Sequence, residues 1–171
     1  MSAPLAQFLS IKEPDSLADV AAIAGLYPSK TADEMRQMVE RHLEPAFEAS
    51  RAGRRTILLA RHDDVLVGTV QAVWEDDTEE PTLLPPGSAV IHHLRTHPDH
   101  RRMGIGRRLL AEAERLAIDR GVGELTLGVE PENVVARLLY EHFGFRAFLT
   151  YRGWDGEPLI GMKKPLSAAT G

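Results

Sequence analysis

A short turn rich in glycine and arginine, residues 101–106, joins a predicted strand to a predicted helix. The apolar run 89–96 predicts the strand, and residues 106–120, closed by Gly121, predict an amphipathic helix. Glycine lets the backbone approach a bound group closely, and the N-terminus of a helix presents N–H groups with partial positive charge. The turn therefore predicts an α/β fold that binds a phosphorylated ligand at the start of a helix.

The spacing of the two glycines distinguishes between three phosphate-binding motifs. A dinucleotide-binding loop, G-x-G-x-x-G, would need glycine where the chain has Leu109, and a Walker A loop would need a lysine followed by a hydroxyl residue, which this turn lacks. The third motif, R-x-x-G-x-G, is the pyrophosphate loop of acyl-CoA-dependent acetyltransferases, and residues 101–106 match it fully. The alternative to all three is an ordinary strand-to-helix turn with solvated arginines.

A second motif lies further along the chain, after a predicted strand at residues 124–129. Residues 133–145 meet every fixed position of the pattern N-x-x-A-x-x-L-Y-E-x-x-G-F. On these two motifs, which span residues 89–145, the chain resembles the GNAT superfamily of N-acetyltransferases, and the resemblance extends over about residues 89–164. It implies a single-domain α/β fold with a mixed, mostly antiparallel sheet flanked by helices, whose splayed central strands form the acyl-CoA cleft.

Length and composition agree with one domain over residues 1–171, ending in a frayed tail at 167–171. The chain has no cysteine, which excludes disulfides, thiolate zinc sites and a cysteine acyl-enzyme. Its 20 basic and 25 acidic residues leave a net charge of −5, which disfavours nucleic acid as a partner and suits a polyanionic cofactor beside a cationic or amine substrate. With no basic leader and no apolar run of membrane length, we expect a cytoplasmic protein without membrane association.

The resemblance implies that acetyl-CoA, as the acyl donor, lies between the strands that end at Thr96 and Val129. Its pantetheine arm would pair with the strand backbone at 94–96, and its pyrophosphate would rest on backbone N–H groups of the turn. Asn133, which also suits the N-cap of the second helix, and the small Ala136 would lie against the cofactor. The cofactor-binding residues implied in this way are Leu94, Arg95, Thr96, Arg101, Arg102, Met103, Gly104, Ile105, Gly106, Arg107, Asn133, Ala136 and Tyr140.

Tyr140 is implied as the general acid for the departing CoA thiolate, because it matches the tyrosine of the family motif. Two helical turns separate it from Asn133, which puts both side chains on one face of the helix. Outside the motif, the same residue would be interpreted as a half-buried tyrosine that packs beside Phe143 and Phe145. The missing cysteine favours direct attack by the amine in a ternary complex.

The general base is not identified by the sequence. Relatives carry a glutamate at the position of Gly128 or around Val90, and this chain has none at either place. A chain of water molecules is one alternative, and the side chains that remain are His92, His93, Glu75 and Glu130. Because side chains alternate along a strand, we expect only one of the two neighbouring histidines to face the cleft. The four histidines between 92 and 100 would point to different faces, so we expect no metal site.

The acceptor is expected to be a small-molecule amine or a protein amino group. By resemblance its pocket lies between residues 26–31 and 151–158, with Trp154 as a wall. Homodimers are common in the family, although nothing in this sequence indicates one. A non-catalytic acyl-CoA sensor on the same fold is the alternative function, and an ATP- or NADP-binding protein is a third.

Overall fold

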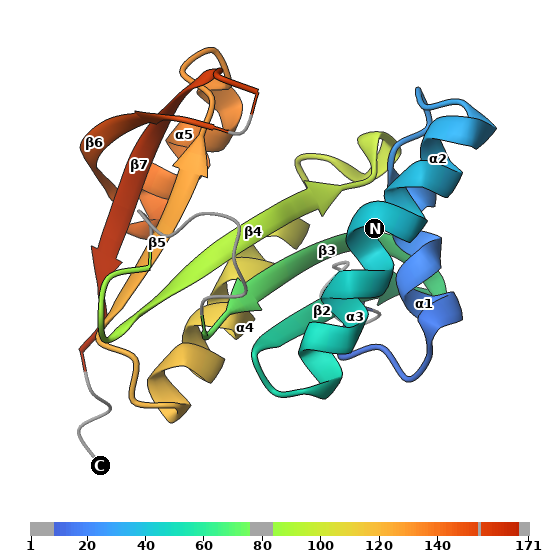
Figure 1. Ribbon diagram of the computed structural model, residues 1–171, viewed down its shortest axis with the longest axis horizontal. Coiled ribbons are helices and arrows are strands. Elements are labelled where there is room, and N and C mark those ends of the chain that lie inside the picture. The colour runs from blue at the N-terminus through green and yellow to red at the C-terminus, as the bar shows by residue number, and fades with distance from the viewer. Residues whose placement is uncertain (1–8, 76–83, 154, 168–171) are drawn as a thin grey trace, which may run out of the picture.

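The computed structural model describes residues 9–75, 84–153 and 155–167, which form one seven-stranded sheet flanked by helices (Figure 1). The strand order is β1-β2-β3-β4-β5-β7-β6, and the β4–β5 pair is parallel while the other pairs are antiparallel. The strands are β1 (Leu9–Lys12), β2 (Arg55–His62), β3 (Val65–Val73), β4 (Ser88–Thr96), β5 (Glu124–Val129), β6 (Arg146–Arg152) and β7 (Pro158–Pro165). The helices are α1 (Leu17–Ala21), the 3-10 helix η2 (Ala22–Leu26), α2 (Ala32–Met38), the π-helical turn η3 (Val39–Leu43), α3 (Glu44–Arg51), the 3-10 helix η5 (Pro98–His100), α4 (Ile105–Asp119) and α5 (Val134–Phe143).

The two central strands, β4 and β5, separate after a short paired stretch. They pair over three positions, of which Val90 opposite Thr126 is the last, and then diverge, as the yellow-green and orange arrows of Figure 1 show. The α/β fold class, the mostly antiparallel sheet and the splayed central strands predicted from the sequence are therefore confirmed. The gap in the hydrogen-bonded ladder leaves one edge of β4 beyond Val90 without a strand partner on the β5 side.

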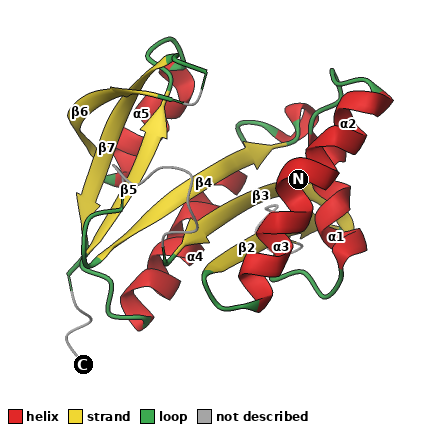
Figure 2. Ribbon diagram, viewed as in Figure 1, coloured by secondary structure: helices red, strands yellow, loops and turns green. Residues whose placement is uncertain are grey.

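Two apolar layers hold helices against opposite faces of the sheet (Figure 2). Alternation along β2 divides its side chains, because Leu58 and Ala60 belong to the layer under α4, whereas Ile57 and Leu59 belong to the layer under α1 and α3. The helix α4 contributes the predicted apolar stripe, in which Leu109, Leu110, Ala113 and Ala117 are buried and Leu116 is half-buried.

The start of α4 is held close to the sheet by Gly68 of β3. A Cβ atom at this position would lie 2.9 Å from Cγ2 of Ile105, the first residue of α4, so any larger residue would push the helix away. The turn that precedes α4 is therefore fixed relative to β3 and β4.

The helices before β2 begin and break where the sequence signals them. Thr31 and Glu34 match the capping-box pattern, and they form a reciprocal capping box at the start of α2. Pro45 predicts that this helix ends or kinks early. The regular α-helix does end early, at Met38, and the backbone continues through the π-helical turn η3 into α3, where Pro45 lies in the first turn.

Two predicted features fall wholly or partly outside the described residues. The acidic loop 75–87 is described only at its ends, and of the tail 167–171 only residue 167 is described. Within the described residues, we find no helix long and apolar enough to cross a membrane.

Candidate functional site

The turn before α4 has the backbone conformation of an anion-binding nest. Arg102 and Gly104 both have positive φ, 65° and 76°, which turns successive N–H groups towards a common point. Gly104 is the N-cap residue of α4, and among the described residues no side chain caps this end and no acidic residue lies in the first turn. The free N–H groups and the helix dipole therefore favour a bound anion such as phosphate.

The side chains of the turn lie either in the core or at the surface, and Gly104 leaves the backbone between them accessible to a ligand. Ile105 is buried in the core, whereas the flanking side chains at 101–103 and 107 are exposed. No heavy atom lies within 4 Å of the place where a Cβ of Gly104 would stand, so its φ, and not lack of space, requires glycine there.

Gly106, in the first turn of α4, lies close to both α5 and the end of β4. A Cβ atom here would lie 3.5 Å from Leu139 of α5, 3.8 Å from Oγ1 of Thr96 and 3.9 Å from Leu94 of β4. The beginning of α4, the end of β4 and the inner face of α5 thus converge at one place. Beyond Val90, β4 pairs with β3 alone, and an unpaired strand edge is what an extended ligand uses for backbone hydrogen bonds. These features fit an acyl-CoA.

Tyr140 lies on α5, one residue after Leu139. Its side chain is 8% exposed, and its ring packs edge-on against Phe145 with the ring centres 5.9 Å apart. Burial raises the pKa of Tyr140 to about 12, so the hydroxyl keeps its proton at any physiological pH and remains a hydrogen-bond donor.

Asn133 and Ala136 lie on the first turn of the same helix. Oδ1 of Asn133 accepts a hydrogen bond from the Ala136 N–H at 3.2 Å, which is the N-cap role that the sequence suggested. The amide nitrogen of Asn133 is the donor that a cofactor contact would use. Ala136 is half-buried against the apolar core.

His92 and His93 lie beside an irregularity in β4. The register between β3 and β4 shifts between Thr69 and Gln71, and His93 lies in the left-handed region with φ of 53°, so β4 contains a bulge. The centres of the two imidazole rings are 5.5 Å apart. Of the two residues, only His93 lines the recess described below, which agrees with the expectation that one of them faces the cleft.

Both histidines are poor bases in this environment. Burial, together with the charges of His93 and Arg55, lowers the pKa of His92 to about 3. Partial desolvation and the charges of Arg55 and His42 lower the pKa of His93 to about 4, although the residue is exposed at the protein surface, where solvent screens such charges. Both imidazoles are therefore neutral at pH 7 and can accept a hydrogen bond, but neither is a strong proton acceptor.

The two carboxylate candidates, Glu75 and Glu130, lie at strand ends. Both side chains are exposed, and neither lines the recess described next. Among the described residues, no group of three or more His, Cys, Asp and Glu side chains is arranged to hold a metal ion.

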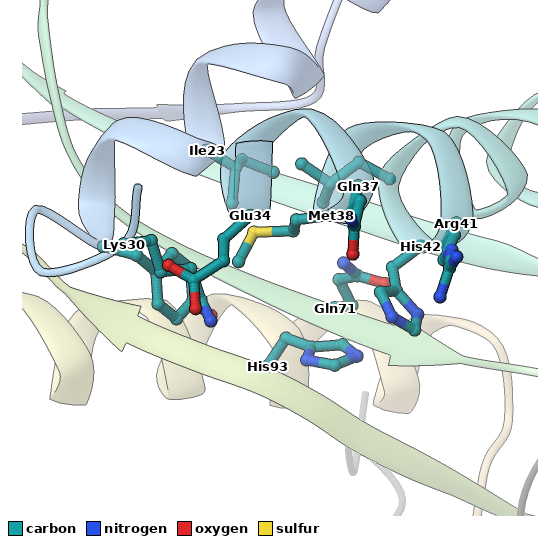
Figure 3. A pocket seen from close by; sticks show the side chains of 11 residues that line it. Ile23, Lys30, Glu34, Gln37, Met38, Arg41, His42, Gln71 and His93 are labelled. Carbon is teal, nitrogen blue, oxygen red and sulfur yellow. The ribbon is translucent and has the colours of Figure 1, made fainter. Parts of the chain in front are cut away.

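A recess of about 370 Å³ opens between the first helices and the middle of the sheet (Figure 3). Tyr27 and Lys30 line it from the stretch 26–31 where an acceptor pocket was expected, and His93 faces it from β4. No described residue of 151–158 lines it, and Trp154 lies outside the described residues. The remaining lining residues are Ile23, Glu34, Gln37, Met38, Arg41, His42, Leu43 and Gln71.

Sequence reasoning missed the polar residues of this recess. Gln71 is 2% exposed, and a buried amide within the apolar strand 65–73 is a signal that could have marked it. Arg41 and His42 lie on the π-helical turn, and no local motif distinguishes them from solvated helix residues.

Comparison with known proteins agrees with this geometry. A sequence model of the acetyltransferase (GNAT) family matches residues 20–145. Among solved structures, the fold is similar to the PaiA N-acetyltransferase of Thermoplasma acidophilum in complex with coenzyme A, with 21% identity, a TM-score of 0.70 and coverage of 92% of this chain and 99% of that one. It is also similar to the ribosomal-protein-S18-alanine N-acetyltransferase of Escherichia coli, with 23% identity, a TM-score of 0.68 and coverage of 94% and 96%. No curated protein sequence matches the chain.

Proposed function

The chain belongs to the GNAT family of acetyltransferases, and on that premise we propose that it transfers an acetyl group from acetyl-CoA to an amine within a ternary complex. One observation carries the proposal. The helix α4 begins uncapped behind the left-handed residues Arg102 and Gly104, next to the place where β4 has separated from β5. The similar PaiA structure in complex with coenzyme A supports the same choice of ligand.

Backbone groups make most of the proposed contacts to the cofactor. N–H groups of the turn and of the first turn of α4, residues 102–107, hold the pyrophosphate. The open edge of β4 at 94–96 pairs with the pantetheine arm, and Asn133 donates its amide to that arm. Bound acetyl-CoA supplies the activated thioester.

The amine has to lose its proton before it can attack, since an alkyl amine has a pKa of about 10.4. With pKa values of about 3 and about 4, His92 and His93 are too weakly basic to hold that proton. We infer that His93, which lines the recess, accepts a hydrogen bond from water there, and that water passes the proton of the amine to solvent. The N–H of Leu94, which follows the bulge, is the proposed donor to the attacked carbonyl oxygen.

Tyr140 is the proposed donor to the departing sulfur. A thiol has a pKa of about 8.5, well below the value of about 12 for this phenol, so complete proton transfer from Tyr140 to the thiolate is unfavourable. A hydrogen bond from the hydroxyl, strengthened as negative charge develops on sulfur, is the role that this pKa favours.

A non-catalytic acyl-CoA sensor is the second candidate function. The observation that favours it is the weakness of the candidate bases, because both histidines have strongly lowered pKa values and both glutamates lie away from the recess. A sensor would bind acetyl-CoA without amine-dependent release of CoA.

Thermal unfolding with acetyl-CoA, ATP or NADPH is the first test. A ligand present at 100 times its Kd adds about 2.7 kcal/mol to the free energy of unfolding, so the true cofactor raises the Tm clearly. Release of CoA thiol is then followed with a panel of amines, and the chain contributes no background because it has no cysteine. If ATP or NADPH raises the Tm more than acetyl-CoA does, the acetyltransferase proposal is wrong.

A further inference from the structure

A second, smaller recess of about 210 Å³ adjoins the one shown in Figure 3. The two recesses share Arg41, His42 and His93, so they form one continuous depression. Among the described residues that line the smaller recess, none is acidic. They are Arg41, His42, Pro45, Ala46, Ala49, Arg54, Arg55 and His93.

Two unusual backbone features and one buried side-chain hydrogen bond bring these basic side chains together. The π-helical turn η3 carries Arg41 and His42, and such turns widen a helix and change the direction of its side chains. The bulge in β4 directs His93 to the same place. The guanidinium of Arg55, at the start of β2, is held by the buried Gln71, whose Oε1 accepts a hydrogen bond from Nη1 at 2.6 Å.

The smaller recess is positively charged in a protein whose net charge is −5. Within the described residues, no carboxylate lies within ion-pair distance of Arg41 or Arg54. The larger recess contains the carboxylate of Glu34, which accepts a hydrogen bond from the Thr31 N–H at 2.7 Å, and the ammonium group of Lys30, whose charge helps to lower the pKa of Glu34. Opposite charges therefore lie together in the larger recess, whereas the charged side chains that line the smaller recess are all basic.

We propose that the acceptor is a small amine that also carries a carboxylate or phosphate, and that Arg41 and Arg54 bind this anionic group. The amine then lies in the larger recess beside His93. Arginine suits this role because its planar, forked donors match carboxylate and phosphate oxygens. This inference rests on the proposed acetyl transfer, and it replaces the cationic substrate that the net charge of the chain had suggested.

Matched pairs of amines test the proposal directly. Each pair differs in one anionic group: 4-aminobutyrate and butylamine, alanine and alaninamide, phosphoethanolamine and ethanolamine. We expect kcat/KM in the CoA-release assay to be at least tenfold higher for the anionic members. Alaninamide also resembles the N-terminus of a peptide, so a preference for it over alanine would point to a protein acceptor and overturn the proposal.

A pair of double variants identifies the residues responsible. The change Arg41→Ala with Arg54→Ala should remove the preference for anionic amines, mainly through KM, without altering the affinity for acetyl-CoA. The matched control is Arg36→Ala with Arg51→Ala, which removes two positive charges from α2 and α3 at exposed positions outside both recesses and should keep the preference. A preference that survives the loss of Arg41 and Arg54 contradicts the proposal.

Calorimetric titration of the same amine pairs, with and without CoA, keeps the two proposals separable. If acetyl-CoA does not bind, the proposed function fails, while the anion site is still judged by whether anionic amines bind more tightly than their neutral partners. If acetyl-CoA binds and the anionic and neutral amines bind and react equally, or neither binds, the inference fails while the cofactor assignment stands.

Discussion

The change Gly104→Ala tests whether the left-handed conformation before α4 serves the cofactor. Gly104 has φ of +76° and open space where a methyl group would stand, so alanine introduces backbone strain without a steric clash. For an ordinary residue this conformation costs about 1–2 kcal/mol relative to the right-handed regions. Because the turn is exposed, the free variant can relax out of the strained conformation, and cofactor binding then has to restore it.

The expected loss of affinity follows from that cost. Since about 1.4 kcal/mol corresponds to a factor of ten, 1–2 kcal/mol weakens acetyl-CoA binding by about 5- to 30-fold. The free energy of unfolding without ligand should fall by no more than the same amount. Isothermal titration with acetyl-CoA measures the first quantity, and urea unfolding of the free protein measures the second.

Gly121 provides a matched control at the other end of α4. It has φ of +75°, again with no heavy atom near the site of a Cβ, so Gly121→Ala carries the same backbone cost. The helix of 15 residues places it about 20 Å from Gly104. We expect Gly121→Ala to lose stability and keep its affinity for acetyl-CoA. Equal loss of affinity in both variants, or none in Gly104→Ala, would refute the nest as the phosphate site.

Three further changes follow from the same geometry. Tyr140→Phe should lower kcat by about 10²- to 10³-fold in the CoA-release assay, the usual cost of losing one hydrogen-bond donor to a developing charge. Acetyl-CoA should still bind, because packing against Phe145 does not need the hydroxyl, and unchanged turnover would exclude Tyr140 from the chemistry. Gly106→Ala should unfold at the same or a higher urea concentration, since alanine favours a helix by up to about 1 kcal/mol, yet bind acetyl-CoA less tightly because its methyl group enters the cleft. Since the folded-state pKa values of His92 and His93 lie below 6.5, the unfolded chain binds more protons between about pH 6.5 and pH 4. The free energy of unfolding should therefore decrease as the pH is lowered through that range, by up to about 1.4 kcal/mol per pH unit from His92 and by less from His93, which is exposed to solvent. His92→Gln should reduce the slope.

Elements with local signals could be predicted from the sequence to within a residue or two. The predicted helix 106–120 is α4, Ile105–Asp119, and the predicted strand 124–129 is β5, Glu124–Val129. Capping residues, glycines and apolar periodicity act over three or four residues. The bounds of a helix or strand can therefore be predicted from the local sequence, without knowing the rest of the fold. The nest residues were named for the same reason, because the glycine spacing reports the backbone conformation directly.

Features that depend on pairing between distant segments were missed. The bulge beside His92 and His93 arises because β4 has one more residue than β3 over the same stretch. Nothing in the local sequence of β4 records the length of its partner. Pro45 predicted an early end or kink of the second helix, but not the π-helical turn that carries the backbone on into α3.

The sequence alone determined the family, the phosphate-binding turn and the tyrosine of α5, because each depends on residues close together in the chain. Only the tertiary structure decided the electrostatics of the two recesses. Arg41 from η3, Arg54 from the start of β2 and His93 from β4 are brought together by packing of helices on the sheet. A charge or a pKa value at such a place depends on distances through space, and those distances exist only once the chain has folded.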